Sequence, residues 1–256
     1  MITSAQNSRI QLVRSLLGRS RERRQSGAFV VEGVRLLEEA LTAGWTFRFA
    51  LYSHALSARG QGLLQQLNEA GVDIEEVTEQ LLTSSSGTEN PQGLMAVLEL
   101  QSLPIPEQID FTLILDEIRD PGNLGSLLRS ATAAGVQAVF LTPGSADAFA
   151  PKVVRSGMGT HFRLPIHLLD WEAIRERLQG LKFVLAEMEA PLACWQADFR
   201  SGLALIIGGE AEGASLAARQ FCNERVHIPM SAGTESLNAA AAGAILLFEV
   251  KRQRDA

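Results

Sequence analysis

The stretch Ile228-Pro-Met-Ser-Ala-Gly-Thr-Glu-Ser-Leu-Asn238 joins a short apolar strand pattern to an alanine-rich helical pattern. Two earlier stretches lie at the same kind of strand-to-helix junction, and they are Asp120-Pro-Gly-Asn-Leu-Gly-Ser-Leu-Leu-Arg129 and Ile207-Gly-Gly-Glu-Ala-Glu-Gly213. Each stretch alone is a weak indication of function. Their order, spacing and shared setting indicate that they belong together.

The chain around these stretches alternates between apolar strand patterns and amphipathic helical patterns. Strands are expected at 111–115, 137–141, 165–168, 182–186, 203–207 and 225–228, with a closing helix over about 236–252. Such alternation predicts an α/β fold with a mostly parallel sheet covered by helices on both faces.

A smaller α/β module is expected to precede this sheet. The connector Ser102-Leu-Pro-Ile-Pro-Glu-Gln108 has two prolines within three residues, which favours an extended and stiff segment. We therefore expect two domains, 1–102 and 109–256, on either side of the connector.

The composition is that of an ordinary globular protein, with 46% hydrophobic and 20% charged residues. The N-terminus lacks a signal-peptide pattern, and the apolar run 237–248 is shorter than the roughly 20 residues of a membrane span. Two cysteines, with no cysteine–histidine spacing suited to zinc, predict neither a disulfide framework nor a metal site. We expect a cytoplasmic enzyme with no membrane partner.

Basic residues are concentrated at the N-terminus. The net charge is −6, but residues 1–35 carry +5, which leaves −11 for the remainder. The arginines of this segment are Arg9, Arg14, Arg19, Arg21, Arg23, Arg24 and Arg35. A local basic patch is what contacts with RNA phosphates require. Charge alone is explained equally well by the solvated face of a helix.

The first stretch places Asn123 after a turn, where its side chain could cap the following helix. Arg129 lies six residues later. On the residues alone, a helix cap and a surface arginine explain both positions. Because arginine is a poor proton acceptor, any chemical role for Arg129 is better understood as electrostatic stabilisation of a phosphate or an oxyanion.

In the second stretch, Gly208 and Gly209 allow a ligand to approach the backbone at the end of a strand. A dinucleotide-binding fingerprint needs a central glycine where Glu210 stands, so that interpretation fails. A carboxylate would repel a pyrophosphate and suits a cationic sulfonium better. In the third stretch, Ser236 and Asn238 could both be helix caps without any chemistry.

The three stretches together resemble the signature motifs of the SpoU-type (TrmH-like) branch of the SPOUT RNA methyltransferases. The resemblance implies methyl transfer from S-adenosylmethionine to a ribose 2′-hydroxyl of structured RNA. By this resemblance the catalytic candidates are Arg129, Asn123, Glu210, Ser236 and Asn238. The candidates for binding the cofactor are Gly208, Gly209, Ile228, Met230 and Leu237.

The segments Ser8-Arg9-Ile10, Phe29-Val-Val-Glu-Gly33 and Pro91-Gln-Gly93 resemble the small L30e-like RNA-binding domain of this family. The resemblance makes Arg9, Arg19, Arg21, Arg23 and Arg24 the RNA-binding candidates. It also implies a C-terminal SPOUT domain with a deep trefoil knot, and a homodimer formed through the apolar final helix. Burial of that helix within its own domain is the alternative. Met158 departs from the alanine that family members often have after the Ser-Gly pair.

Ribosomal RNA is favoured over tRNA, because this style of N-terminal domain is common in enzymes that act on ribosomal RNA. The alternatives are a tRNA 2′-O-methyltransferase, a base-modifying SPOUT enzyme and a catalytically silent RNA-binding module. The Ser236-Leu-Asn238 match argues against the base-modifying enzyme. The silent module is less favoured because every motif position carries a chemically competent residue.

Overall fold

A computed structural model describes residues 1–88, 91–210, 212–231 and 236–256. Two compact units make up this part of the chain. The first comprises Met1–Gln101 and Phe149–Phe162, and the second comprises Ser102–Ala148 and Arg163–Ala256. Ala211 of the second motif and residues 232–235 of the third motif lie outside the described residues.

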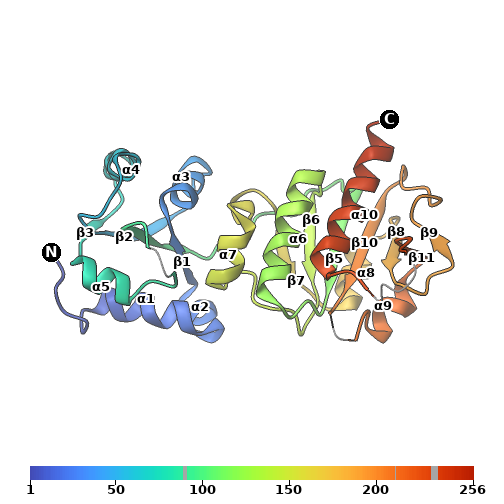
Figure 1. Ribbon diagram of the computed structural model, residues 1–256, viewed down its shortest axis with the longest axis horizontal. Coiled ribbons are helices and arrows are strands. Elements are labelled where there is room, and N and C mark those ends of the chain that lie inside the picture. Colours follow the sequence, from blue (N-terminus) through green and yellow to red (C-terminus); the bar gives the residue numbers. More distant parts are fainter. Residues whose placement is uncertain (89–90, 211, 232–235) are drawn as a thin grey trace. The chain divides into compact units, whose positions relative to one another are not determined.

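The first unit is built on a four-stranded sheet in the order β1-β4-β2-β3. Its strands are β1 (Ala28–Glu32), β2 (Phe47–Tyr52), β3 (Ile74–Glu76) and β4 (Leu94–Glu99). β4 is antiparallel to β1 and β2, and β3 is parallel to β2. The helices are α1 (Ser8–Gly18), α2 (Ser20–Ser26), α3 (Val34–Thr42), α4 (Ala58–Glu69) and α5 (Glu79–Ser84). Figure 1 shows α3 and α4 over one face of the sheet, with α1 and α5 over the other.

The first unit also contains a segment that the sequence placed in the C-terminal domain. This segment, Phe149–Phe162, carries α7 (Pro151–Gly157) and the 3-10 helix η1 (Thr160–Phe162). The Phe149 ring lies 4.9 Å from the Phe29 ring, and the Phe162 ring lies 5.2 Å from the Trp45 ring. These edge-on aromatic contacts pack both ends of the segment against the first unit. Met158 ends α7 with a left-handed backbone (φ 49°).

The second unit is built on a seven-stranded sheet in the order β7-β6-β5-β10-β8-β11-β9, in which every described pair is parallel. The strands are β5 (Phe111–Asp116), β6 (Ala138–Leu141), β7 (Ile166–Leu168), β8 (Lys182–Ala186), β9 (Leu192–Ala193), β10 (Leu203–Gly208) and β11 (Glu224–His227). The predicted α/β fold with a mostly parallel sheet is confirmed. Only the two-residue β9 was not expected.

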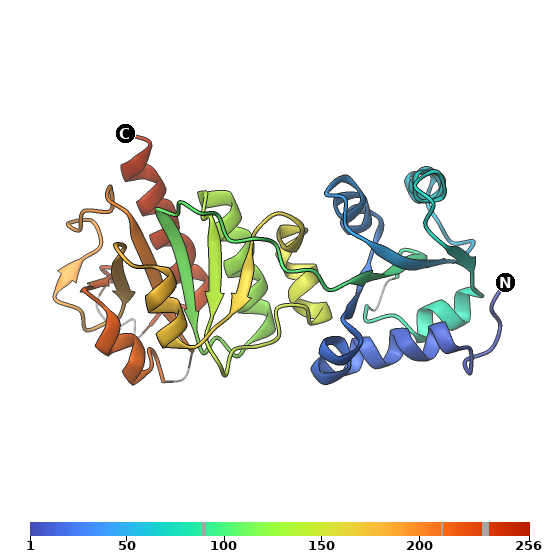
Figure 2. The same cartoon turned by 180° about the vertical axis from the view of Figure 1, so that it is seen from behind.

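Helices cover both faces of this sheet, as Figures 1 and 2 show from opposite sides. α6 (Pro121–Ala134) and α10 (Ala239–Arg254) lie on one face, and α8 (Trp171–Arg177) and α9 (Leu216–Phe221) lie on the other. α6 and α10 touch closely, because a Cβ atom at Gly243 would lie only 2.2 Å from Leu127 Cδ2. Within the described residues, no helix has both the length and the apolar character needed to cross a membrane.

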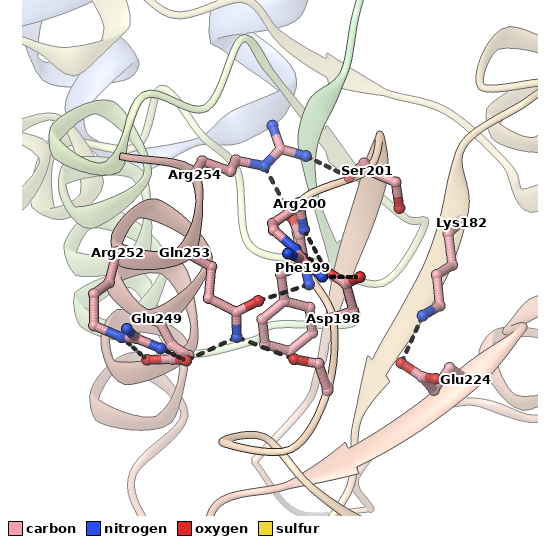
Figure 3. Close-up of polar contacts among 11 residues, drawn as sticks. Lys182, Asp198, Phe199, Arg200, Ser201, Glu224, Glu249, Arg252, Gln253 and Arg254 are labelled. Carbon is pink, nitrogen blue, oxygen red and sulfur yellow. Dashed lines mark hydrogen bonds and ion pairs between the residues drawn. The ribbon is translucent and has the colours of Figure 1, made fainter. Parts of the chain in front are cut away.

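The final helix is packed mainly within its own unit. Gly243, Leu246, Leu247 and Val250 of α10 are buried, whereas Phe248 remains 47% exposed. Its C-terminal end is tied to the segment before β10 (Figure 3): Gln253 accepts a hydrogen bond of 2.9 Å from the Phe199 backbone, and Arg254 Nη2 donates one of 2.7 Å to the Ser201 carbonyl. α10 therefore has a fixed position relative to the sheet, and its first residues are held beside the strand ends.

Candidate active site

The ends of β5 and β10 bring the first two motifs together. The two strands are parallel neighbours in the middle of the sheet, and Asp116 pairs with Gly208 at their carboxyl ends. The first motif continues from β5 into α6, and the second turns back after Gly208. The third motif follows β11, two strands away from β10 in the same sheet. All three therefore leave the sheet at its carboxyl edge.

The cap of α6 is Asp120, so the prediction that Asn123 caps this helix is wrong. Asp120 Oδ1 accepts a hydrogen bond of 2.8 Å from the Asn123 backbone, and Pro121 occupies the first helical position. Proline is well suited to that position because its ring presets the helical φ. With Asp120 as the cap, the Asn123 side chain is available for other contacts.

One chain of side-chain hydrogen bonds connects the three motifs. Asn123 Nδ2 donates to Glu210 Oε1 at 2.9 Å, and Asn238 Nδ2 donates to Asn123 Oδ1 at 2.9 Å. Asn238 is also the cap of α10, since its Oδ1 accepts from the backbone of Ala240 at 2.9 Å. The cap predicted at Asn238 is present, and the same side chain extends into the site through its other atom.

Arg129 stands apart from this chain. It is exposed on α6, six residues beyond Asn123, which is about 9 Å along a helix that rises 1.5 Å per residue. Those six residues also turn the helix by about 240°, so the two side chains leave it in different directions. In the part of the chain that the structure describes, Arg129 has no hydrogen bond to Asn123 or Glu210. Neither of these two residues therefore orients Arg129 in the structure.

A cavity of about 680 Å³ lies beside the hydrogen-bonded chain. All five residues expected to hold the cofactor line it, and so do Glu210, Ser236 and Asn238. The apolar side chains of Ile228, Met230 and Leu237 contribute to its wall. This size and mixture of walls are typical of small-molecule sites.

The two glycines of the second motif are required by close backbone contacts. A Cβ atom at Gly208 would lie 2.5 Å from the Ala214 nitrogen, and one at Gly209 would lie 2.7 Å from the Glu117 carbonyl oxygen. Neither distance is possible for a real side chain. The glycines thus let Gly213 and Ala214 approach the end of β10, and let Gly209 lie against the residue that follows β5.

Charged residues outside the three motifs also line the site. Glu187, which follows β8, lines the cavity and accepts hydrogen bonds from Arg219 (2.7 Å) and Arg225 (3.2 Å). Arg119 and Glu117 line an adjacent hollow that shares Gly209 and Glu210 with the cavity, and their hydrogen bond of 2.6 Å is the main reason that the pKa of Arg119 is raised. No sequence motif identifies these residues. Their only signal was that Glu187 and Glu117 come directly after apolar strands.

The five arginines proposed for RNA contact fall into two groups. Arg9 pairs with Asp73 and Glu75 and lies over the Phe49 ring, while Arg23 is 4% exposed and donates to the Leu16 carbonyl. Arg19, Arg21 and Arg24 are exposed. The first group is engaged in holding the unit together, so the accessible basic surface at the α1–α2 corner comes from the second.

Family models match both halves of the chain. Residues 110–248 match the SpoU rRNA Methylase family, and residues 7–96 match the MRM3-like substrate binding domain. Both matched ranges lie inside the two domains expected from the sequence.

Curated relatives are similar over almost the whole chain. The 23S rRNA (uridine(2479)-2′-O)-methyltransferase of Streptomyces viridochromogenes is 34% identical, over 98% of this chain and 92% of the relative. The 23S rRNA (guanosine(2553)-2′-O)-methyltransferase RlmP of Bacillus subtilis is 29% identical, over 98% of each. A solved structure of the SpoU methyltransferase AviRb from S. viridochromogenes, in complex with AdoMet, superposes with a TM-score of 0.86 at 33% identity, over 97% of this chain and 99% of that one.

Proposed function

The chain belongs to the SpoU rRNA methylase family, and from this membership we propose that it transfers a methyl group from S-adenosylmethionine to a ribose 2′-hydroxyl of ribosomal RNA. Two relatives that it matches along their length are named 2′-O-methyltransferases of 23S rRNA. The single observation that carries the proposal is the hydrogen-bonded chain Glu210–Asn123–Asn238, whose two end residues line the cavity. It joins residues of all three family motifs, which supports a shared role for them at this cavity.

The cavity fits the methyl donor. S-adenosylmethionine, when bound, supplies an electrophilic methyl group on a positively charged sulfur. We assign its binding to Gly208, Gly209, Ile228, Met230 and Leu237, where the glycines allow close backbone approach and the other three provide apolar walls. The carboxylates of Glu189 and Glu210 also line the cavity, and their negative charge suits a cation, whereas the Glu187 carboxylate is engaged by Arg219 and Arg225.

The acceptor hydroxyl is proposed to enter beside Asn123, Ser236 and Asn238. Glu210, Ser236 and Asn238 are exposed and Asn123 is half-buried, so a ribose can reach them. The amides of Asn123 and Asn238 are already fixed by their mutual bond, and they can position a hydroxyl without moving themselves. We propose direct, in-line transfer, for which these amides would orient the hydroxyl toward the bound methyl donor.

Arg129 is proposed to stabilise the negative charge that develops on the 2′-oxygen, or to hold the neighbouring phosphate. A guanidinium offers five fixed N–H donors and keeps its charge at any working pH. Arg129 is exposed, so we propose that a bound substrate or a second protein chain positions its guanidinium group for this role.

RNA docking is proposed to involve the exposed arginines Arg19, Arg21 and Arg24 of the first unit. The match of residues 7–96 to a substrate binding domain supports this location. Arg9 and Arg23 are proposed to shape this surface from within, since their guanidinium groups are engaged by the unit itself.

The proposal extends to features that the family implies. The likeness to AviRb over nearly the whole chain supports a deep trefoil knot in the C-terminal part. A homodimer would cover the exposed ring of Phe248 on α10. We expect the enzyme to act in the cytoplasm, where it would meet ribosomal RNA.

The function is tested with purified protein and unmethylated RNA. Calorimetric titration measures binding of S-adenosylmethionine, and transfer of a tritiated methyl group is measured on 23S rRNA, 16S rRNA and tRNA separately. The proposal predicts cofactor binding and incorporation into ribosomal RNA. Incorporation into tRNA alone would identify tRNA as the substrate in place of ribosomal RNA. RNA binding without cofactor binding would identify a silent RNA-binding module.

A further inference from the structure

Asp116 is a buried carboxylate at the end of β5, next to the site but outside its lining. Its exposed fraction is 1%. Oδ2 accepts a hydrogen bond of 2.7 Å from the Ser215 backbone, and Oδ1 accepts bonds of 3.2 Å each from the Ser215 hydroxyl, Thr142 Oγ1 and Trp171 Nε1. Four donors from three separate elements thus converge on one side chain.

A carboxylate in this position costs stability unless its partners compensate for the loss of water. In the described residues Asp116 has no cationic partner, and its neighbours in β5 are fully buried apolar residues. An apolar residue would fit the centre of the sheet with less penalty. The polar side chain at this buried position therefore points to a task for its hydrogen bonds.

The bonds of Asp116 reach the far end of the loop 209–215. Before the loop, Gly208 pairs with Asp116 in the β5–β10 register. At the far end, Ser215 binds Asp116 through both its backbone N–H and its hydroxyl, and Ser215 is also the cap of α9. Asp116 thus pairs through β5 with the residue at which the loop leaves the sheet. Its carboxylate binds the residue at which the loop enters α9.

Thr142 connects Asp116 to the near end of the loop as well. Its Oγ1 donates to Asp116 and accepts a hydrogen bond of 2.9 Å from the Glu117 backbone. Glu117 has a positive φ of 55°, which is uncommon for a residue other than glycine. Its carbonyl oxygen is the atom against which Gly209 packs. The Thr142 bond thus helps to hold Glu117 in the conformation that receives Gly209.

This loop carries most of the second motif. Glu210 lies within it and binds Asn123, and Gly209, Gly213 and Ala214 line the cavity assigned to the methyl donor. A shift of the loop ends would displace both the cavity wall and the Glu210 carboxylate.

We propose that Asp116 is a positioning residue for this reaction. Its carboxylate fixes both ends of the loop 209–215 through Ser215 and Thr142, and so sets the position of Glu210 and the shape of the donor cavity. The inference rests on the proposed function, because that function gives the cavity its ligand.

Two variants that loosen the loop test the proposal. The matched control is a variant that removes a different hydrogen-bond donor to the same Asp116 carboxylate. Ser215→Ala and Thr142→Val each remove a hydroxyl bonded to Asp116 at one end of the loop, while Ser215→Thr and Thr142→Ser keep the hydroxyl. Trp171→Phe removes a bond to the same Oδ1 atom from α8, which is not part of the loop. Affinity for S-adenosylhomocysteine is measured by calorimetry, kcat by methyl transfer and Tm by thermal unfolding.

We expect Ser215→Ala and Thr142→Val to weaken S-adenosylhomocysteine binding about threefold to tenfold, the effect of one lost hydrogen bond, and to lower kcat. The two hydroxyl-retaining variants should restore both values. Trp171→Phe should lower Tm to a similar extent and leave affinity and kcat unchanged. The proposal is overturned if Trp171→Phe weakens binding as much as the loop variants do, or if both loop variants keep wild-type affinity. Absence of binding in the wild-type protein would instead overturn the proposed function, and this inference with it.

Discussion

Asn123 and Glu210 are 87 positions apart in the chain, and their side chains are joined by a hydrogen bond of 2.9 Å from Nδ2 to Oε1. The bond exists because β5 and β10 are adjacent parallel strands whose following segments meet at one edge of the sheet. It fixes the Glu210 carboxylate beside the cavity and leaves the other side of the Asn123 amide bonded to Asn238.

Asn123→Ala should lower kcat by about a hundredfold, the effect of removing one fixed polar group from a catalytic site. Stability should change little, because the cap of α6 is Asp120 and remains in place. Methyl-transfer rates and thermal unfolding measure the two effects. A large fall in Tm with a nearly normal rate would show that Asn123 serves the helix and not the reaction.

Arg129→Ala should abolish turnover without lowering Tm, because the side chain is exposed and makes no described contact that holds the fold. The matched control is Arg175→Ala, which removes an exposed helical arginine from α8, on the opposite face of the sheet. We expect this control to retain its activity. A near-normal rate for Arg129→Ala would remove the electrostatic role that we assign to it.

Gly208→Ala should prevent cofactor binding, since its Cβ atom would have to occupy a position 2.5 Å from the Ala214 nitrogen. The loop would be pushed away from β10, and the cavity would change shape. Gly62→Ala is the control, because a Cβ atom at this site in α4 meets nothing within 4 Å and alanine favours the helix by about 1 kcal/mol. Calorimetry measures the affinity of both variants for S-adenosylmethionine. Unchanged affinity in Gly208→Ala would contradict the assignment of the cavity to this cofactor.

The combined variant Arg19→Ala, Arg21→Ala and Arg24→Ala should weaken RNA binding and reduce its salt dependence. Each lost phosphate contact is expected to lower the slope of log K against log salt by about 0.7 to 0.9. Arg9→Ala provides the contrast: its guanidinium pairs with Asp73, so its loss should reduce Tm more than RNA affinity. Filter binding at several salt concentrations measures the slope, and an unchanged slope in the triple variant would place the RNA elsewhere.

The Glu249 carboxylate should make the stability of the second unit depend on pH. Hydrogen bonds from Arg252, and further bonds from Gln253, lower the pKa of Glu249 in the folded protein. Because the folded pKa lies below the unfolded value, this contribution is present above about pH 4.3, the ordinary glutamate pKa, and is lost as pH falls through the folded value. Glu249→Gln should therefore cost about 1 kcal/mol at pH 7, and this cost should shrink as the pH falls below about 4.3.

A double-mutant cycle checks the cause of that effect. Arg252→Ala should remove most of the same stability, and adding Glu249→Gln to it should cost little more. If the two losses are simply additive, the ion pair does not account for the pH dependence.

The sequence was sufficient for the regular parts of the fold. Strictly alternating apolar strands and helices identify a parallel sheet, and all six predicted strands of the second unit are present. Asp120 was missed as a cap, although an Asp-Pro pair at a helix start is a good local signal. Asn123 was close enough to the start of the helix to look like the cap.

Long-range contacts explain what the sequence could not supply. The return of Phe149–Phe162 to the first unit depends on rings at Phe29 and Trp45, more than a hundred residues earlier, and no local pattern records it. The same holds for Asp116, which reads as the end of an apolar strand until the folded chain brings Ser215 to it. The match to family motifs predicted a site at the strand ends, and the structure brings the three motifs together there through hydrogen bonds that no local pattern records.

The most direct test of the central claim is mass spectrometry of the nucleosides released from unmethylated 23S rRNA after incubation with the protein and methyl-deuterated S-adenosylmethionine. We expect one deuterated 2′-O-methylnucleoside, and its loss in the Asn123→Ala variant. Deuterium on a base, or no transfer to this RNA by wild-type protein that binds the cofactor, would contradict it.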